Sequence, residues 1–124
     1  MKTLTPELIS ELRSRLDGEV LDDLSSRLQY ATDASAYREE PLLVVRPGHA
    51  ADIRELVLFA GEHGLPLIPR TAGTSLAGQV VGHGIIADVS RHMNAILEIN
   101  ADEKWARVEP GVILDELNMA AAEY

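Results

Sequence analysis

The hydrophobic and polar positions divide the chain into alternating helical and extended segments. Apolar residues recur at the 3.6-residue spacing of a helix in four segments, the second being the weakest: residues 6–17, 20–30, 50–63 and 112–124. Short apolar or alternating runs predict five strands: residues 42–47, 65–69, 84–90, 95–100 and 104–109. Their order gives a β-α-β unit followed by an antiparallel hairpin. We therefore expect an α+β (α/β-like) fold with a small mixed sheet and flanking helices.

Residues that start and stop helices support these boundaries. Thr5 and Pro6 are typical of an N-cap and a first helical position, and Gly64 is typical of a C-terminal stop. The last helical pattern reaches Tyr124 without such a stop. We therefore expect the chain to be a fragment of a longer polypeptide, the alternative being a helix that ends there naturally.

Composition narrows the classes of function. The chain has 124 residues, 46% of them apolar, which fits one small domain. It carries 20 acidic and 11 basic residues, a net charge of -9, so most of its exterior repels nucleic acid and anionic membranes. It has no cysteine, which excludes disulfides, thiolate nucleophiles and cysteine-ligated metals in this segment. Since no signal-like or membrane-length apolar run occurs, we expect a cytoplasmic protein without a transmembrane segment.

The sequence PRTAGTSLAGQVVG, residues 69–82, is the strongest candidate for a ligand site. Gly73 and Gly78 can adopt a positive φ, and successive amides in such a turn form an anion-binding concavity. Hydroxyl, amide and guanidinium donors accompany them: Thr71, Thr74, Ser75, Gln79 and Arg70. Residues 65–97 contain a single acid, Asp88, although the chain as a whole is acidic. We predict a diphosphate ligand here; a ligand-free surface loop, with its arginine in a surface salt bridge, is the alternative.

Two known phosphate motifs fit this region poorly. Residues 73–78 have the glycine spacing of a Walker A loop, but Gln79 stands where that motif needs lysine. Residues 82–87 read G-x-G-x-x-A, but they lead into a strand, whereas the dinucleotide motif leaves a strand and opens a helix. We exclude both motifs.

Several other conspicuous side chains have ordinary structural interpretations. The chain contains four histidines: His49, His63, His83 and His92. They lack the spacing of metal ligands on one element, so we predict no metal site. Asp88 is expected to start a turn with Ser90. We expect Arg46 in a surface salt bridge and Tyr30 as a packing or surface aromatic.

Four sequence blocks occur in an order that resembles a known family. They are TDASAYR (32–38), PRTAGTSLAGQ (69–79), DVSRHMN (88–94) and EPGVILDELN (109–118). In this order they resemble the FAD-binding domain of the vanillyl-alcohol oxidase / p-cresol methylhydroxylase (PCMH-type) superfamily. The branch with glycolate oxidase D-subunits, D-lactate dehydrogenases and D-2-hydroxyglutarate dehydrogenases is the most similar. The resemblance implies an N-terminal helical segment, residues 1–30, followed by the first half of an FAD-binding domain, residues 31–124.

The resemblance also implies how FAD would be held. The glycine-rich loop would wrap the FAD pyrophosphate through backbone amides, and a Pro-Gly turn would lie against the cofactor. The implied contact residues are Arg70, Thr71, Ala72, Gly73, Thr74, Ser75, Leu76, Gly78, Gln79, Pro110 and Gly111. Many members have glycine where this chain has Ala72. Thr74 stands where some members have the histidine that links the flavin covalently, so we expect FAD to bind non-covalently.

The activity implied by the resemblance belongs to a longer parent protein. It is oxidation of a 2-hydroxy acid of the D-lactate, glycolate or D-2-hydroxyglutarate class to a 2-oxo acid. Electrons would pass to a quinone, a cytochrome, a partner flavoprotein or an iron–sulfur module in the C-terminal part, and such an acceptor could hold the parent at the inner membrane. Catalytic residues would lie outside this chain, so we assign none, and we expect the fragment alone to be inactive and to bind FAD weakly. The alternatives are a stand-alone nucleotide- or anion-binding regulatory module and a ligand-free interaction domain.

Overall fold

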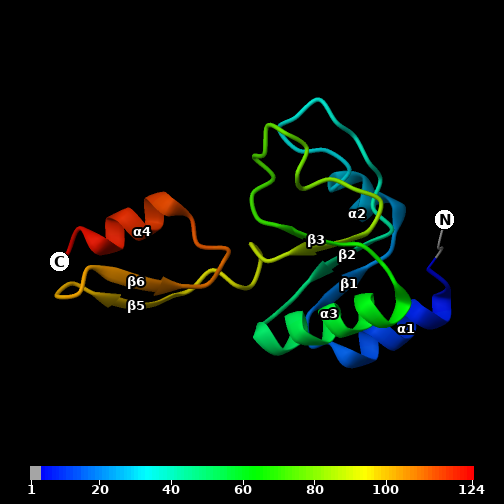
Figure 1. Cartoon of the computed structure of the whole chain (residues 1–124), viewed down its shortest axis with the longest axis horizontal. Coiled ribbons are helices and arrows are strands. Elements are labelled where there is room, and N and C mark those ends of the chain that lie inside the picture. The colour runs from blue at the N-terminus through cyan, green and yellow to red at the C-terminus, as the bar shows by residue number, and fades with distance from the viewer. Residues whose placement is uncertain (1–3) are drawn as a thin grey trace.

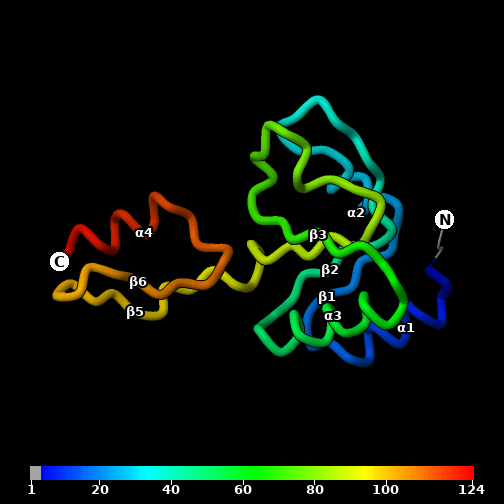
Figure 2. Tube along the Cα trace, in the orientation of Figure 1, coloured from blue at the N-terminus to red at the C-terminus, as the bar shows by residue number. Residues whose placement is uncertain are grey.

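The computed structural model describes residues 4–124, which form two lobes (Figure 1). The large lobe, residues 4–94, contains α1 (Pro6–Arg15), β1 (Glu19–Leu21), α2 (Leu24–Gln29), β2 (Leu43–Arg46), α3 (Ala50–His63), β3 (Leu67–Arg70) and β4 (Ile85–Asp88). The small lobe, residues 95–124, contains β5 (Ile96–Asn100), β6 (Trp105–Val108) and α4 (Leu114–Ala121). The trace in Figure 2 passes from the large lobe to the small lobe after β4.

A four-stranded mixed sheet forms the centre of the large lobe, in the order β1-β2-β4-β3. Strands β2, β4 and β3 are parallel, and β1 is antiparallel to β2. Successive side chains point to opposite faces of the sheet. Leu43 and Val45 pack in one cluster with α1 and α3, whereas Val44 packs with Tyr30 in a second cluster. The expected mixed sheet with flanking helices is confirmed.

The predicted helix boundaries hold best for α1 and α3. The hydroxyl of Thr5 accepts a hydrogen bond from the amide of Leu8 (3.4 Å), and Pro6 opens α1. Helix α3 has the predicted range, and Gly64 ends it with φ 59° in the left-handed region. At 14 residues, α3 is the longest helix of residues 4–124, and none of these helices combines the length and apolar character needed to cross a membrane.

The helix expected over residues 20–30 is wrong in its first part, where the structure has strand β1. Val20 lies opposite Val45 of β2 and is buried in the core. Helix α2 begins only after Asp23, whose carboxylate accepts a hydrogen bond from the amide of Ser26 (2.8 Å). Pairing with a neighbouring strand therefore outweighs the weak local helical pattern.

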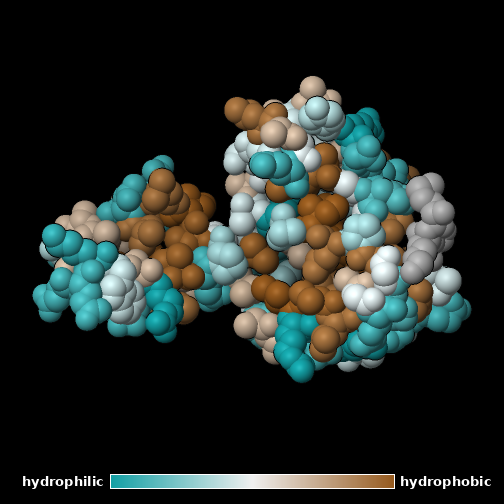
Figure 3. Space-filling view, viewed as in Figure 1, coloured by the Kyte–Doolittle hydropathy of each residue, from teal (hydrophilic) through white to brown (hydrophobic). Residues whose placement is uncertain are grey.

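The small lobe contains the predicted antiparallel hairpin, which forms a two-stranded sheet of its own. Asn100 pairs with Trp105 next to the turn, and α4 follows the hairpin. Figure 3 shows apolar side chains gathered on the visible face of this lobe. Its exposed large apolar residues are Leu97, Trp105, Ile113, Leu114, Met119 and Tyr124.

Candidate functional site

The glycine-rich segment, residues 71–79, forms a largely exposed loop that leaves the carboxyl end of β3. Gly73 and Gly78 have φ values of 70° and 72°, which confirms the predicted left-handed conformation. Within residues 4–124, no backbone hydrogen bond uses the amide N–H groups of residues 71–74. These donors are therefore available to an anion, as the cradle hypothesis requires.

A pocket of about 470 Å³ lies between the two lobes, beside this loop. Thr71 and Ala72 line it from the loop, Ser90 lines it from the turn after β4, and residues 110–114 line it from the small lobe. In open sheets with parallel strands, ligands typically bind outside the carboxyl ends of the strands, and both β3 and β4 end here. The volume falls within the usual range of small-molecule sites, about 300–1,000 Å³.

The structure brings four of the predicted contact residues together around this pocket: Thr71, Ala72, Pro110 and Gly111. The other predicted residues do not line it: Arg70, Gly73, Thr74, Ser75, Leu76, Gly78 and Gln79. Arg70 directly precedes the loop, and the others belong to it. A ligand that filled the pocket and followed the loop would be long and would contact both lobes.

The first turn of α4 also faces the pocket. Ile113, Leu114 and Glu116 are among its lining residues. Ile113 is the N-cap of α4 and offers no side-chain acceptor to the free amides of the helix start. A helix N-terminus carries partial positive charge and favours bound anions. Asp115 and Glu116 both lie in the first turn of α4, and their carboxylates offset this partial charge, so the loop amides are the anion-binding feature of the pocket.

Gly111 holds the small lobe close to the large lobe. Its amide donates to the carbonyl oxygen of Met93 (2.8 Å). A Cβ at this position would lie 2.5 Å from the carbonyl oxygen of Val89 and 2.6 Å from that of Met93. Only glycine permits this approach, and the approach closes one side of the pocket.

Ser75 shapes the far part of the loop. Its hydroxyl oxygen accepts hydrogen bonds from the amides of Ala77 (3.3 Å) and Gln79 (3.4 Å). The hydroxyl also donates to the side-chain oxygen of Gln79 (3.1 Å). Two of the predicted polar contact residues therefore bind each other in this structure and stabilise the turn.

Arg70 lies inside the bend of the loop and is half-buried. Its Nη1 atom donates to the carbonyl oxygens of Tyr30 and Val80, both at 3.3 Å. Its guanidinium lies over the ring of Tyr30, 5.2 Å from the ring centroid. A Cβ on Gly73 would lie only 2.5 Å from its Nη2 atom. Arg70 makes no ion pair among the described residues, so the surface salt bridge considered from sequence is not found.

A buried hydrogen bond connects Tyr30 with Asp88, at the end of β4. The hydroxyl of Tyr30 donates to Oδ2 of Asp88 (2.6 Å) and accepts from Nε of Arg46 (3.2 Å). Oδ1 of Asp88 accepts from the amide (2.9 Å) and hydroxyl (2.6 Å) of Ser90, which confirms the predicted turn. Burial raises the pKa of the Tyr30 hydroxyl, and the hydrogen bond to Asp88 raises it further, so Tyr30 remains a proton donor.

Sequence reasoning missed the segment that supports the loop from outside, residues 31–39. The amide of Ala34 donates to the carbonyl oxygen of Gly73 (3.1 Å). The ring of Tyr37 lies against Gly78, where a Cβ would be 2.5 Å from Cδ2 of the tyrosine. The block TDASAYR contributed to the family resemblance, but nothing in its composition indicated a contact with a loop about 40 residues later.

Comparison with known proteins decides the family. Residues 41–124 match the family described as "FAD binding domain". The chain belongs to this FAD-binding domain family. The matched range includes the glycine-rich loop, both parallel strands that end at the pocket, and the small lobe.

Relatives of this FAD-binding domain are considerably longer proteins. The chain is 41% identical over 119 residues to D-2-hydroxyglutarate dehydrogenase of Pseudomonas putida, and the match covers 93% of this chain and 12% of that protein. It is 36% identical over 94 residues to glycolate oxidase subunit GlcD of Bacillus subtilis, covering 74% of this chain and 20% of that protein. The chain thus spans between about an eighth and a fifth of the length of these relatives.

Solved structures share the fold of the domain. P-cresol methylhydroxylase with bound substrate matches with a TM-score of 0.81 at 21% identity, over 94% of this chain and 24% of that chain. 6-Hydroxy-D-nicotine oxidase of Arthrobacter nicotinovorans matches with a TM-score of 0.74 at 31% identity, over 87% and 24% of the two chains. The predicted PCMH-type fold and family are therefore confirmed.

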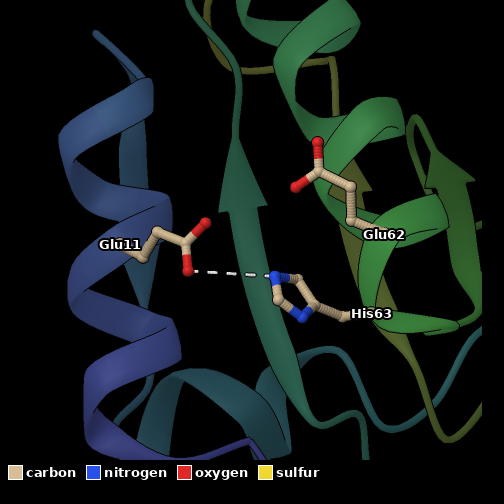
Figure 4. A group of neighbouring side chains, drawn as sticks. All are labelled: Glu11, Glu62 and His63. Atoms are coloured by element: carbon tan, nitrogen blue, oxygen red, sulfur yellow. Dashed lines mark ion pairs between the residues drawn. The ribbon is translucent and has the colours of Figure 1, made fainter.

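Two clusters of carboxylates and histidine lie elsewhere in the large lobe: Glu11, Glu62 and His63, and Asp17, His49 and Asp52. Figure 4 shows the first, in which Glu11 extends from α1 toward two residues of α3. Nε2 of His63 lies 3.8 Å from Glu11, and Arg15 donates to Glu62 (2.8 Å) and to Glu11. In the second cluster, Nε2 of His49 is hydrogen-bonded to Asp17 (2.8 Å). Ion pairs and hydrogen bonds account for both clusters, and we assign no metal to them.

Proposed function

We propose that this domain binds FAD non-covalently and holds its diphosphate in the glycine-rich loop. The uncommitted amides of residues 71–74, next to a pocket that the small lobe completes, carry this proposal. The cofactor-binding residues would be Arg70, Thr71, Ala72, Gly73, Thr74, Ser75, Leu76, Gly78, Gln79, Pro110 and Gly111. A threonine hydroxyl at Thr74 forms no flavin linkage of the histidine type, which supports reversible binding.

We also propose that the intact protein carrying this sequence oxidises a 2-hydroxy acid to a 2-oxo acid. The names of its relatives, D-2-hydroxyglutarate dehydrogenase and glycolate oxidase, support this class of substrate. FAD, when bound, supplies the electron acceptor for such an oxidation. The electrons would then leave for a further acceptor.

The described residues would contribute binding and orientation to this reaction. The amides of residues 71–74 would neutralise the diphosphate. Gly111 would keep the lobes close enough for one cofactor to contact both. We assign no catalytic acid or base among residues 4–124.

Substitution of the two left-handed glycines tests the loop assignment. A β-branched residue is strained at φ near 70°, and its Cβ would also overlap Arg70 at position 73 or Tyr37 at position 78. We expect Gly73→Val and Gly78→Val, made in the intact protein, to lose the visible absorbance of the flavin after purification, while far-ultraviolet circular dichroism stays close to that of the wild type.

Gly61→Val is the matched control. Gly61 lies on the exposed side of α3, and a Cβ there meets no atom within 4 Å. This variant should purify with as much flavin as the wild type. Loop variants that retain a full complement of FAD would contradict the assignment. A wild-type protein that binds ADP but no flavin would favour the regulatory nucleotide module over the oxidoreductase.

A further inference from the structure

We propose that Tyr30 is a positioning residue that holds the glycine-rich loop in its FAD-binding shape. The inference rests on the function proposed above and adds a residue that neither lines the pocket nor belongs to the loop. Tyr30 follows α2 as its C-cap, and its side chain is only 8% exposed. Contacts on three sides of this side chain carry the argument.

The first contact anchors the ring in the sheet. Tyr30 packs against Val44 of β2 and Ile86 of β4, both fully buried. Its hydroxyl uses its donor on Asp88 and an acceptor position on Arg46, so its polar atom is satisfied although it is buried. The ring is therefore fixed by apolar packing at its sides and by hydrogen bonds at its tip.

The second contact, between the ring and Arg70, restrains the loop. The guanidinium lies over the fixed ring, and its Nη1 atom holds the carbonyl oxygens of Tyr30 and Val80 together. Arg70 is the last residue of β3 and Val80 follows the loop, so one side chain joins the two ends of the loop. Gly73 packs directly on the same guanidinium. The loop is thus wrapped around an arginine whose own position depends on Tyr30.

The third contact reaches the wall of the pocket. Asp88 accepts from Tyr30 with Oδ2 and from Ser90 with Oδ1. Ser90 lines the pocket together with Thr71 and Ala72. Loss of the Tyr30 hydroxyl would leave a buried carboxylate oxygen without its donor and would loosen the turn that forms this wall.

The physical consequence is preorganisation. The loop has no regular secondary structure and is largely exposed, so few contacts within it oppose local opening. A ligand that must order a loop binds more weakly, because part of its binding free energy offsets the lost conformational entropy. By holding both ends of the loop, the Tyr30 and Arg70 pair reduces that loss, and removal of the Tyr30 side chain should weaken FAD binding although Tyr30 itself is not among the proposed FAD contacts.

The first test measures FAD affinity in the intact protein. FAD is removed, and the apoprotein is titrated with FAD while quenching of flavin fluorescence is recorded. We expect Tyr30→Leu to raise the Kd about tenfold, because it removes the ring beneath Arg70 and both hydroxyl hydrogen bonds. Tyr30→Phe keeps the ring and should give a smaller rise. Val20→Ala, in the core cluster on the other face of the sheet, lowers stability but should leave the Kd unchanged.

The second test does not depend on FAD. Leu76 is 82% exposed within the loop, and chymotrypsin cleaves after leucine as well as after aromatic residues. In the apoprotein, Tyr30→Leu should be cut after Leu76 several times faster than the wild type and Val20→Ala, because its loop opens more often. If Tyr30→Leu does not fold, the FAD titration and the cleavage rate of Tyr30→Phe test the same inference.

The outcomes separate this inference from the proposed function. Wild-type Kd and wild-type cleavage in the tyrosine variants would overturn the positioning role, and so would an equal weakening in Val20→Ala. Faster cleavage in a protein that binds no FAD would support the loop-holding role and contradict the FAD proposal alone.

Discussion

Asp52 connects three parts of the large lobe through one buried carboxylate. It lies in the first turn of α3 and is 2% exposed. Its two oxygens accept hydrogen bonds from the amides of Gly48 (2.8 Å), Asp17 (2.9 Å) and Gly18 (2.9 Å). Burial alone would raise the pKa of Asp52, but these backbone hydrogen bonds together lower it below its usual range. Asp52 is therefore charged in the folded protein and ties the turn before β1 to the start of α3.

Asp52→Asn should destabilise the protein by about 2 kcal/mol, because an amide group cannot accept with both of its ends. The pH dependence has a defined sign. Since the folded pKa lies below the unfolded value of about 3.9, the stabilisation is fully present above that pH and is lost as the pH falls through the folded pKa. Urea unfolding at a series of pH values should show a steeper loss of stability below pH 4 in the wild type than in the variant.

The control is Asp102→Asn, in the exposed hairpin turn. It should leave both the stability and its pH dependence close to those of the wild type. Equal unfolding free energies for the wild type and Asp52→Asn at pH 7 would show that the buried carboxylate does not hold these segments together.

At the scale of elements, the docking of the small lobe depends on the Pro-Gly turn before α4. Gly111→Ala would place a Cβ about 2.5 Å from two backbone carbonyl oxygens, and backbone cannot move aside cheaply. We expect this substitution to lower stability by about 1–3 kcal/mol, the usual cost of overpacking, and to weaken FAD binding by displacing one wall of the pocket. Differential scanning calorimetry and the flavin titration would measure the two effects.

Gly61→Ala is the comparison for that experiment, because its new methyl group would meet open space in a helix. It should keep or slightly raise the melting temperature. If Gly111→Ala melted at the same temperature as Gly61→Ala and bound FAD equally well, the close approach at Gly111 would have no role in joining the lobes.

The elements also show what sequence reasoning can and cannot predict. Helix α3 was predictable because its apolar spacing, its acidic first turn and Gly64 all indicate the same boundaries. Strand β1 was not, because three residues form it and its main cause is pairing with β2. The local pattern carries little information about a partner strand more than 20 residues away in the sequence.

The same distinction applies to the site. The left-handed glycines and the donor-rich loop could be predicted because local backbone geometry demands them. The hydrogen bond between Tyr30 and Asp88 could not, since it joins residues 58 positions apart. The sequence suggested Arg70 as a phosphate ligand, whereas in the structure two backbone carbonyls and a tyrosine ring already contact its guanidinium. Contacts between residues so far apart in the sequence can be recognised only once the fold is known.

At the scale of the whole molecule, the arrangement of the two lobes creates the pocket. The sheet of the large lobe delivers the glycine-rich loop and the turn after β4 to one edge, and the small lobe adds the Pro-Gly turn and the start of α4. Neither lobe alone lines the whole cavity. In a chain with a net charge of -9, this edge presents loop amides that make no backbone hydrogen bond within residues 4–124, which explains how an acidic protein could accept an anionic cofactor.

The most direct test of the central claim is an experimental structure of the intact protein with FAD. We predict that oxygens of the diphosphate lie within hydrogen-bonding distance, about 3 Å, of the amide nitrogens in residues 71–74, with Tyr30 and Arg70 arranged as described here. A structure in which FAD binds with its diphosphate away from this loop, and the amides of residues 71–74 contact only solvent, would contradict the account.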